Sequence, residues 1–80
     1  MKPCVYVLQS RSGRLYYGST SDLPRRLEQH ARGHTATTAK DAPWTLVASR
    51  EFPALDEARA QERIFKRWKN PARVLKWMQG

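Results

Sequence analysis

The chain has 80 residues, which leaves room for a single domain, and we expect that domain to span residues 1–80. Hydrophobic residues make up 40% of it, a share that argues against a disordered chain. Its one cysteine excludes an intrachain disulfide and a cysteine-based zinc site. No apolar run approaches the ~20 residues needed to cross a bilayer, and no signal peptide is visible, so we expect a cytoplasmic protein.

The charge is the most informative part of the composition. Fifteen Lys and Arg residues stand against seven Asp and Glu residues, which gives a formal net charge of +8. Such a balance on a small domain indicates a polyanionic partner, most often nucleic acid. An anionic membrane surface is the competing interpretation. Composition does not separate a nuclease from a protein that only binds nucleic acid, so that distinction rests on the motifs.

Two short strands begin the predicted fold. Residues 4–9 and 15–19 are rich in β-branched and aromatic side chains, and the Gly-containing turn between them predicts a β-hairpin. A three-residue loop ending at Gly13 would bring Tyr6 and Tyr16 to one face of the sheet. A two-residue turn would shift the register by one and separate the two tyrosines. The sequence favours neither register strongly.

The rest of the chain predicts helices around one further strand. Capping and stop residues bound a helix at about 22–32, and a small polar loop follows over 33–43. An apolar stretch with imperfect alternation at 44–52 predicts a third strand, and 54–68 predicts a second helix. A short terminal helix over 72–78 would complete the order ββαβα(α), which is an α+β fold.

Glu62 does not fit its surroundings on the second helix. It lies at helical spacing among Leu55, Ala58 and Phe65, where a carboxylate needs a cation, a metal or a hydrogen-bond partner. A basic strip follows the neighbouring edge of the same helix. A metal site beside a phosphate track explains this pattern, and so does an ordinary Glu–Arg pair at the boundary of the helix. The strip consists of Arg59, Arg63, Lys66 and Arg67.

Arg26 and His30 lie one turn apart beside the apolar side of the first helix. An arginine there can clamp a phosphate through its planar fork, and a histidine can accept a proton. The alternative is structural: the arginine stem covers the core and the histidine packs within it. Tyr6 and Tyr16 are equally ambiguous, because strand tyrosines usually belong to the core and keep a solvated hydroxyl. Trp77 is the tryptophan expected to be exposed for base stacking.

The spacing of these residues resembles that of the GIY-YIG nuclease domain, in particular its small stand-alone bacterial members. The resemblance covers nearly the whole chain and is most specific over residues 15–30. Cys4 and Val5 stand where the first half of the motif carries Gly and Ile, a mild departure because neither side chain performs the chemistry. The matching segments are Val5-Tyr6, Tyr16-Tyr17-Gly18, Ser19 to Leu23, Arg25-Arg26-Leu27 with His30, Pro43 to Val47, and Ala60-Gln61-Glu62 leading into Lys66 to Lys69.

The resemblance implies a small three-stranded antiparallel sheet flanked by helices, with an active site of five side chains. Tyr6 and Tyr16 would line that site, and one of them would take a proton from the attacking water. Such a role requires a phenol pKa below its usual value of about 10, an effect expected from Arg26 and a metal. Arg26 would stabilise the phosphate, His30 would lie one turn later, and Glu62 would bind one divalent ion, Mg²⁺ or Mn²⁺.

The resemblance further implies a metal-dependent endonuclease that hydrolyses phosphodiester bonds of single-stranded, branched or duplex DNA. DNA repair is the expected setting, and no small-molecule cofactor is expected. The alternative is a nucleic-acid-binding module on the same fold without significant turnover, and a peripheral membrane protein is a weaker third. The oligomeric state stays open. The residues expected to contact nucleic acid are Gly18, Arg25, Lys40, Arg59, Arg63 and Lys66.

Overall fold

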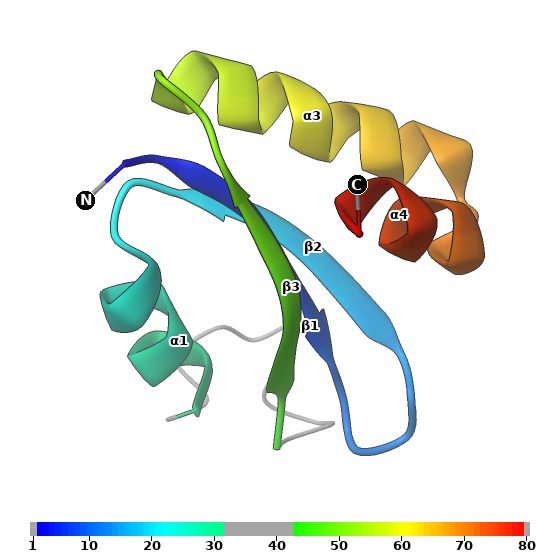
Figure 1. The fold of residues 1–80 in the computed structure, drawn as a ribbon. Helices are drawn as coiled ribbons and strands as arrows, with labels where there is room; N and C mark the ends of the chain where they lie inside the picture. The colour runs from blue at the N-terminus through cyan, green and yellow to red at the C-terminus, as the bar shows by residue number, and fades with distance from the viewer. Residues whose placement is uncertain (1, 32–42, 80) are drawn as a thin grey trace.

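The computed structural model describes residues 2–31 and 43–79. The strands form one sheet in the order β2-β1-β3, and both pairs are antiparallel (Figure 1). The predicted α+β fold with a three-stranded antiparallel sheet is confirmed, and each element lies within one residue of its expected bounds. In chain order the elements are β1 (Cys4–Gln9), β2 (Leu15–Thr20), α1 (Leu23–Ala31), β3 (Thr45–Glu51), α3 (Leu55–Trp68) and α4 (Pro71–Met78).

The β1–β2 hairpin adopts the register of the three-residue loop. Tyr6 pairs with Gly18, and Leu8 pairs with Tyr16. Gly13 takes a φ of 93° in the loop, a left-handed conformation that favours glycine. Because paired residues of an antiparallel ladder point to the same face, Tyr6 and Tyr16 share one face of the sheet.

A β-bulge in β3 explains the imperfect alternation of that segment. Val7 pairs with Ala48, whereas the next residue, Leu8, pairs with Leu46. Val47 is therefore the extra residue, and it is 43% exposed. An extra residue reverses the faces of the side chains that follow it, so the sequence mixes two parities within one strand.

Helices cover both faces of the sheet, with α1 on one side and α3 and α4 on the other (Figure 1). Alternate residues of β1 point into two separate buried clusters, as expected for a central strand that is buried on both faces. The candidate functional site lies between these helix layers, at the free edge of β2. The cluster under α3 and α4 holds Val5, Val7, Phe65 and Val74, and the cluster under α1 holds Cys4, Tyr6 and Leu8, with Leu23 and Leu27 packed against it.

A tight turn at the predicted helix break separates α3 from α4. Lys69 follows α3 in the left-handed conformation, with a φ of 51°, and the Asn70 side chain then caps α4 by accepting a hydrogen bond from the Arg73 backbone N at 3.1 Å. The turn folds Trp77 of α4 back onto Phe65, with ring centroids 5.2 Å apart. Trp77, the tryptophan expected to be exposed for base stacking, is therefore partly buried, because α4 packs its ring against the core.

Candidate active site

Three predicted site residues meet at one phenol oxygen under α1. Tyr6 reaches this point from β1, whereas Arg26 and His30 reach it from successive turns of α1. Arg26 Nε donates a hydrogen bond to Tyr6 Oη at 3.3 Å, and His30 Nε2 lies 3.2 Å from the same oxygen. Arg26 Nη1 also donates to the Gln29 side chain at 3.1 Å. Two hydrogen bonds therefore hold the guanidinium in place before any ligand arrives.

Tyr6 and His30 are closed off from solvent, with exposed fractions of 0% and 1%. Burial raises the pKa of Tyr6, and the hydrogen bond and charge of Arg26 only reduce that rise. The expected lowering of this phenol's pKa is therefore wrong, because desolvation outweighs the neighbouring cation. Burial, followed by the charge of Arg26, lowers the pKa of His30 from its ordinary value of 6.5, so this imidazole is neutral at pH 7.

Gly18 provides the space that the Tyr6 phenol occupies. The glycine is buried opposite Tyr6 on β2, and a Cβ at this position would collide with the phenol ring and its oxygen. We expected Gly18 to let nucleic acid approach the backbone. In the structure it is the Tyr6 side chain that makes the close approach.

Tyr16 is the more accessible of the two predicted tyrosines. It is half-buried on the same face of the sheet, and its ring stands edge-on to His30, with centroids 5.0 Å apart. Trp44 also packs edge-on against the Tyr16 ring, with centroids 6.1 Å apart. Arg26 interacts electrostatically with both Tyr6 and Tyr16, so the same guanidinium lies close to both phenols.

Glu62 approaches the edge of β2 from the opposite face of the sheet. Its Oε1 accepts a hydrogen bond from Ser19 Oγ at 2.6 Å, and its Oε2 accepts one from Lys66 Nζ at 2.6 Å. The side chain is 20% exposed, so it lies at the margin of the core and not within the apolar stripe. The carboxylate has the partners that its position requires, although the cation is Lys66 and not the arginine considered above.

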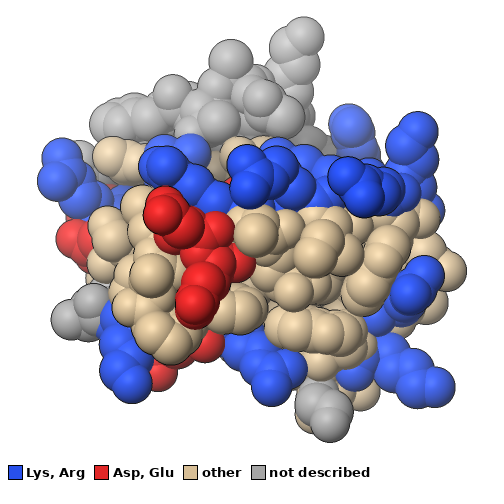
Figure 2. All heavy atoms as spheres, turned by 90° about the horizontal axis from the view of Figure 1, so that it is seen from above, with Lys and Arg blue, Asp and Glu red and all other residues tan. Residues whose placement is uncertain are grey.

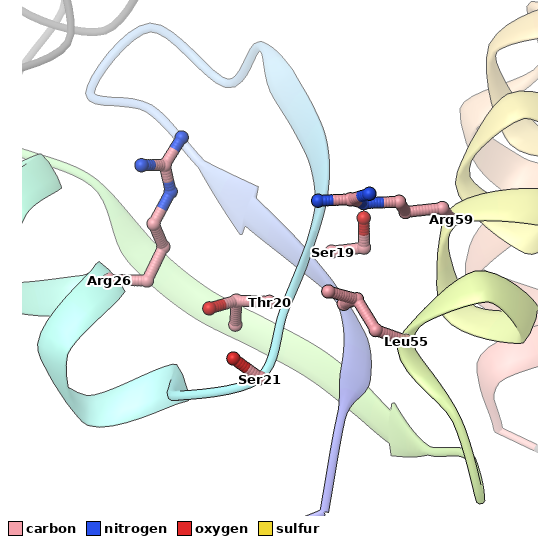
Figure 3. A pocket seen from close by; sticks show the side chains of 6 residues that line it. All are labelled: Ser19, Thr20, Ser21, Arg26, Leu55 and Arg59. Atoms are coloured by element: carbon pink, nitrogen blue, oxygen red, sulfur yellow. The ribbon is translucent and has the colours of Figure 1, made fainter.

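Two adjoining pockets lie between Arg26 on α1 and Glu62 on α3, and Figure 3 shows the one beside Arg26. Ser19 and Arg59 line both pockets, so the two form one groove across the edge strand. The pocket beside Glu62 has a volume of about 320 Å³, and the pocket beside Arg26 has one of about 290 Å³. The first is lined by Ser19, Arg59, Glu62 and Arg63, and the second by Ser19, Thr20, Ser21, Arg26, Leu55 and Arg59.

The remaining predicted contacts lie at different distances from this groove. Arg25 is exposed on α1, and Lys66 is bound to Glu62 at the groove's end. Lys40 lies outside the described residues. The hydroxyl groups of Ser19, Thr20 and Ser21 line the groove but were not among the predicted site residues. The run of three hydroxyl residues at the end of β2 and just after it is a visible signal, but only the packing of α3 brings Ser19 next to Glu62.

The donor atoms near Glu62 restrict the kind of metal that could bind. Within residues 2–31 and 43–79, no group of three or more His, Cys, Asp or Glu side chains could hold a metal ion. Glu62 supplies one carboxylate at an open pocket, with the Ser19 hydroxyl beside it. Mg²⁺ commonly keeps several waters and takes one or two carboxylates together with substrate phosphates. These residues therefore fit a hydrated hard cation that shares a phosphate, and they do not fit a closed zinc site.

Comparison with known proteins identifies the family. The family described as "GIY-YIG catalytic domain" matches residues 2–76. The chain belongs to the GIY-YIG family. The match implies a nuclease-type fold and a nucleic-acid substrate.

Relatives of this GIY-YIG domain are small bacterial proteins named UPF0213. One from Streptococcus pneumoniae is 39% identical over 71 residues, which cover 88% of this chain and 72% of the relative. Another, from Xanthomonas axonopodis pv. citri, is 38% identical over 77 residues, which cover 95% of this chain and 74% of the relative. A solution NMR structure of a UPF0213 protein from Bacillus halodurans superposes with a TM-score of 0.59 at 31% identity, covering 99% of this chain and 84% of that one.

Proposed function

We propose that this GIY-YIG domain is a metal-dependent endonuclease that hydrolyses DNA phosphodiester bonds. The observation that carries the proposal is the groove across β2, which has Arg26, held by the buried Tyr6 phenol, at one end and the Glu62 carboxylate at the other. Phosphodiester hydrolysis needs a positioned cation for the phosphate, a group that handles the water's proton and stabilisation of the leaving oxygen. Arg26 and Glu62 of the groove, with Tyr16 beside Arg26, are the candidate residues for these tasks.

Arg26 is the proposed phosphate clamp. Its Nε and Nη1 are already bound to Tyr6 and Gln29, which orients the guanidinium without substrate. A cation fixed in this way stabilises the charge that develops on the phosphate and needs little reorganisation during the reaction. Tyr6 and His30 are then positioning residues, because both are buried and neither reaches solvent.

Tyr16 is the proposed tyrosine for the attacking water. Tyr6 has no exposed surface, and its raised pKa keeps the proton on its oxygen at neutral pH. Tyr16 is half-buried beside the same arginine, so part of its side chain is open to a water molecule near Arg26. Geometry thus favours Tyr16 over Tyr6 for general-base chemistry.

Glu62 is the proposed ligand of one Mg²⁺ or Mn²⁺ ion, with Ser19 orienting its carboxylate. When bound, such an ion supplies Lewis-acid stabilisation of the leaving oxygen. Lys66 occupies Oε2 at present, so it must give up this hydrogen bond for the ion to reach that oxygen. Arg59 and Arg63 line the same pocket and would attract the phosphate that the ion shares.

The second candidate is a nucleic-acid-binding module without turnover on the same fold. The hydrogen bonds of Ser19 and Lys66 favour it, because they occupy both oxygens of Glu62, the one carboxylate among the described residues that line the groove. The same basic side chains serve both functions, so charge does not distinguish them. A membrane-surface role has less support, since the apolar side of α3 packs into the core. Across the part of the chain that the structure describes, no helix is long and apolar enough to span a bilayer.

Cleavage assays on single-stranded, branched and duplex DNA test the proposal. Purified protein is incubated with labelled DNA and Mg²⁺ or Mn²⁺, beside the variants Glu62→Ala, Arg26→Ala and Tyr16→Phe. We expect each variant to lose at least about 100-fold in cleavage rate. Arg11→Ala, in the exposed β1–β2 turn, is the control and should cleave normally. Tight binding by the wild type with no cleavage of any substrate would favour the binding module, and equal cleavage by all variants would indicate a contaminating nuclease.

A further inference from the structure

Arg59 lies where the two pockets of the groove meet. It projects from the second turn of α3, and its guanidinium reaches over Ser19 at the edge of β2 (Figure 3). Among the described residues its side chain makes no hydrogen bond or ion pair, and the residue is exposed. The five donors of this guanidinium are therefore available to a ligand.

The pocket between Arg26 and Arg59 is suited to an anion. Its walls carry two guanidinium groups, and three hydroxyl side chains line the edge of β2 between them. None of its described lining residues is acidic, in contrast to the neighbouring pocket, which contains Glu62. Two arginines and several hydroxyl donors around one cavity of about 290 Å³ are the donor set that recognises a phosphate group.

The two arginines come from helices on opposite faces of the sheet. Arg26 belongs to α1 and Arg59 to α3, and the edge strand β2 lies between them (Figure 3). Viewed down onto α3, Lys and Arg side chains form a band along one edge of this face, and the acidic side chains visible lie beside the band and in the left half of the view (Figure 2). Because Arg63 and Arg59 of α3 line the adjoining pockets in turn, a strand of nucleic acid that follows these arginines reaches this pocket.

We propose that this pocket is a phosphate-binding subsite in which Arg26 and Arg59 hold one phosphate from opposite sides of β2. The recognition of phosphate follows from the pocket alone, and nucleic acid as the source of that phosphate rests on the proposed function. Because Ser19 and Arg59 also line the Glu62 pocket, a phosphate held here lies directly beside the carboxylate. Arg59 is thus a further phosphate ligand, supplied by α3.

Binding without metal tests the subsite independently of cleavage. A short fluorescein-labelled oligothymidylate is titrated in EDTA with the wild type, Arg59→Ala, Arg59→Lys and Arg11→Ala, and the anisotropy is measured. Arg59→Ala should weaken binding at least about tenfold, because charged hydrogen bonds to phosphate are lost. Arg59→Lys should recover only part of this loss, since an ammonium lacks the planar fork. Arg11→Ala removes the same charge from the exposed turn and should change the Kd by less than about threefold.

A titration with inorganic phosphate, followed by amide NMR, tests the location. Phosphate should shift the backbone amides of Ser19, Thr20 and Ser21 in the wild type, and Arg59→Ala should weaken this response. Equal losses of oligonucleotide affinity in Arg59→Ala and Arg11→Ala would overturn the proposal, because Arg59 would then contribute only net charge. Shifts that avoid the three hydroxyl residues would overturn it as well. If both binding results hold while the wild type cuts no DNA, the subsite stands and the nuclease proposal fails.

Discussion

Gly18 has no side chain, and the Tyr6 phenol fills the space that a side chain at this position would occupy. Gly18→Ala would place a methyl group against the buried phenol, so either the ring or strand β2 must shift. We expect the free energy of unfolding to fall by about 2–3 kcal/mol, in the range of overpacked core sites. We also expect cleavage to be lost, because the phenol that orients Arg26 moves. Urea denaturation measures the first effect and the DNA assay measures the second.

Gly13→Ala is the matched control for this substitution. Gly13 has a φ of 93°, and a Cβ added there would meet nothing within 4 Å, so an alanine is strained but touches no neighbour. The left-handed conformation should cost about 1 kcal/mol and leave cleavage intact. Loss of activity in both variants would mean that hairpin strain, and not the Tyr6 contact, controls the site.

His30 makes the stability of the fold depend on pH. Its pKa in the folded protein is lowered by burial and by Arg26, whereas in the unfolded chain it returns to about 6.5. Below that value the unfolded chain binds the extra proton, so the free energy of unfolding falls as the pH decreases, by at most about 1.4 kcal/mol per pH unit. Urea unfolding at pH 7.5 and pH 5.5 should show this decrease, and His30→Gln should flatten it. An unchanged pH slope in the variant would contradict the assignment.

At the scale of elements, α3 carries a cation, Lys66, that competes with a metal ion for the Glu62 carboxylate. Lys66 Nζ occupies Glu62 Oε2 at 2.6 Å, so a divalent ion that binds this oxygen must displace the ammonium. Lys66→Met should therefore tighten Mn²⁺ binding severalfold, as measured by electron paramagnetic resonance of free Mn²⁺. Folding stability should change little, because an exposed i,i+4 ion pair contributes only about 0.3–0.5 kcal/mol.

Arg67→Met is the control for the Lys66 substitution. It removes one positive charge from the same exposed helix but lines neither pocket of the groove. We expect it to change Mn²⁺ affinity less than Lys66→Met does. If both variants bind Mn²⁺ equally well, general charge and not occupation of the carboxylate governs the metal.

The elements themselves were predictable from local sequence, whereas their pairings were predictable only in part. Alternation, caps and breakers located the strands and helices of the described residues, because these signals act over a few residues. The turn at Gly13 was compatible with two registers, and the imperfect alternation around Val47 did not by itself specify a bulge. Both are decided by which side chains the finished sheet buries, which depends on residues far apart in the chain.

The residues of the candidate site were predictable from the sequence, but their burial and their hydrogen-bond partners were not. Motif spacing indicated Tyr6, Arg26 and Glu62, yet the direction of the Tyr6 pKa was wrong because complete burial arises only when α1 packs on the sheet. The role of Ser19 was missed for a similar reason. Its partner Glu62 is 43 residues away on another element, so only the tertiary structure joins them.

At the scale of the whole molecule, the net charge of +8 and the basic groove make different predictions for salt dependence. If positive charge all over the surface binds nucleic acid, as a general coat, most of the eight excess charges would contribute to the affinity. If binding is confined to the groove, roughly three to five phosphates are neutralised, and the slope of log Kobs against log salt for a single strand should be about −2 to −3.5. Arg26, Arg59 and Arg63 line the groove, Lys66 is bound to its Glu62, and the exposed Arg25 precedes Arg26 in the chain.

Anisotropy titrations of the oligothymidylate between about 50 and 200 mM KCl measure this slope. We expect a value in the range of the groove, which Arg59→Ala should make shallower by about 0.7, the contribution of one single-strand phosphate contact. Arg11→Ala should leave the slope unchanged, because the turn that carries it is not part of the groove. A slope much steeper than about −3.5, shared equally by both variants, would show that the charge binds nucleic acid as a coat. Oligonucleotides of different sequence should bind with similar affinity, since phosphate contacts carry no sequence information.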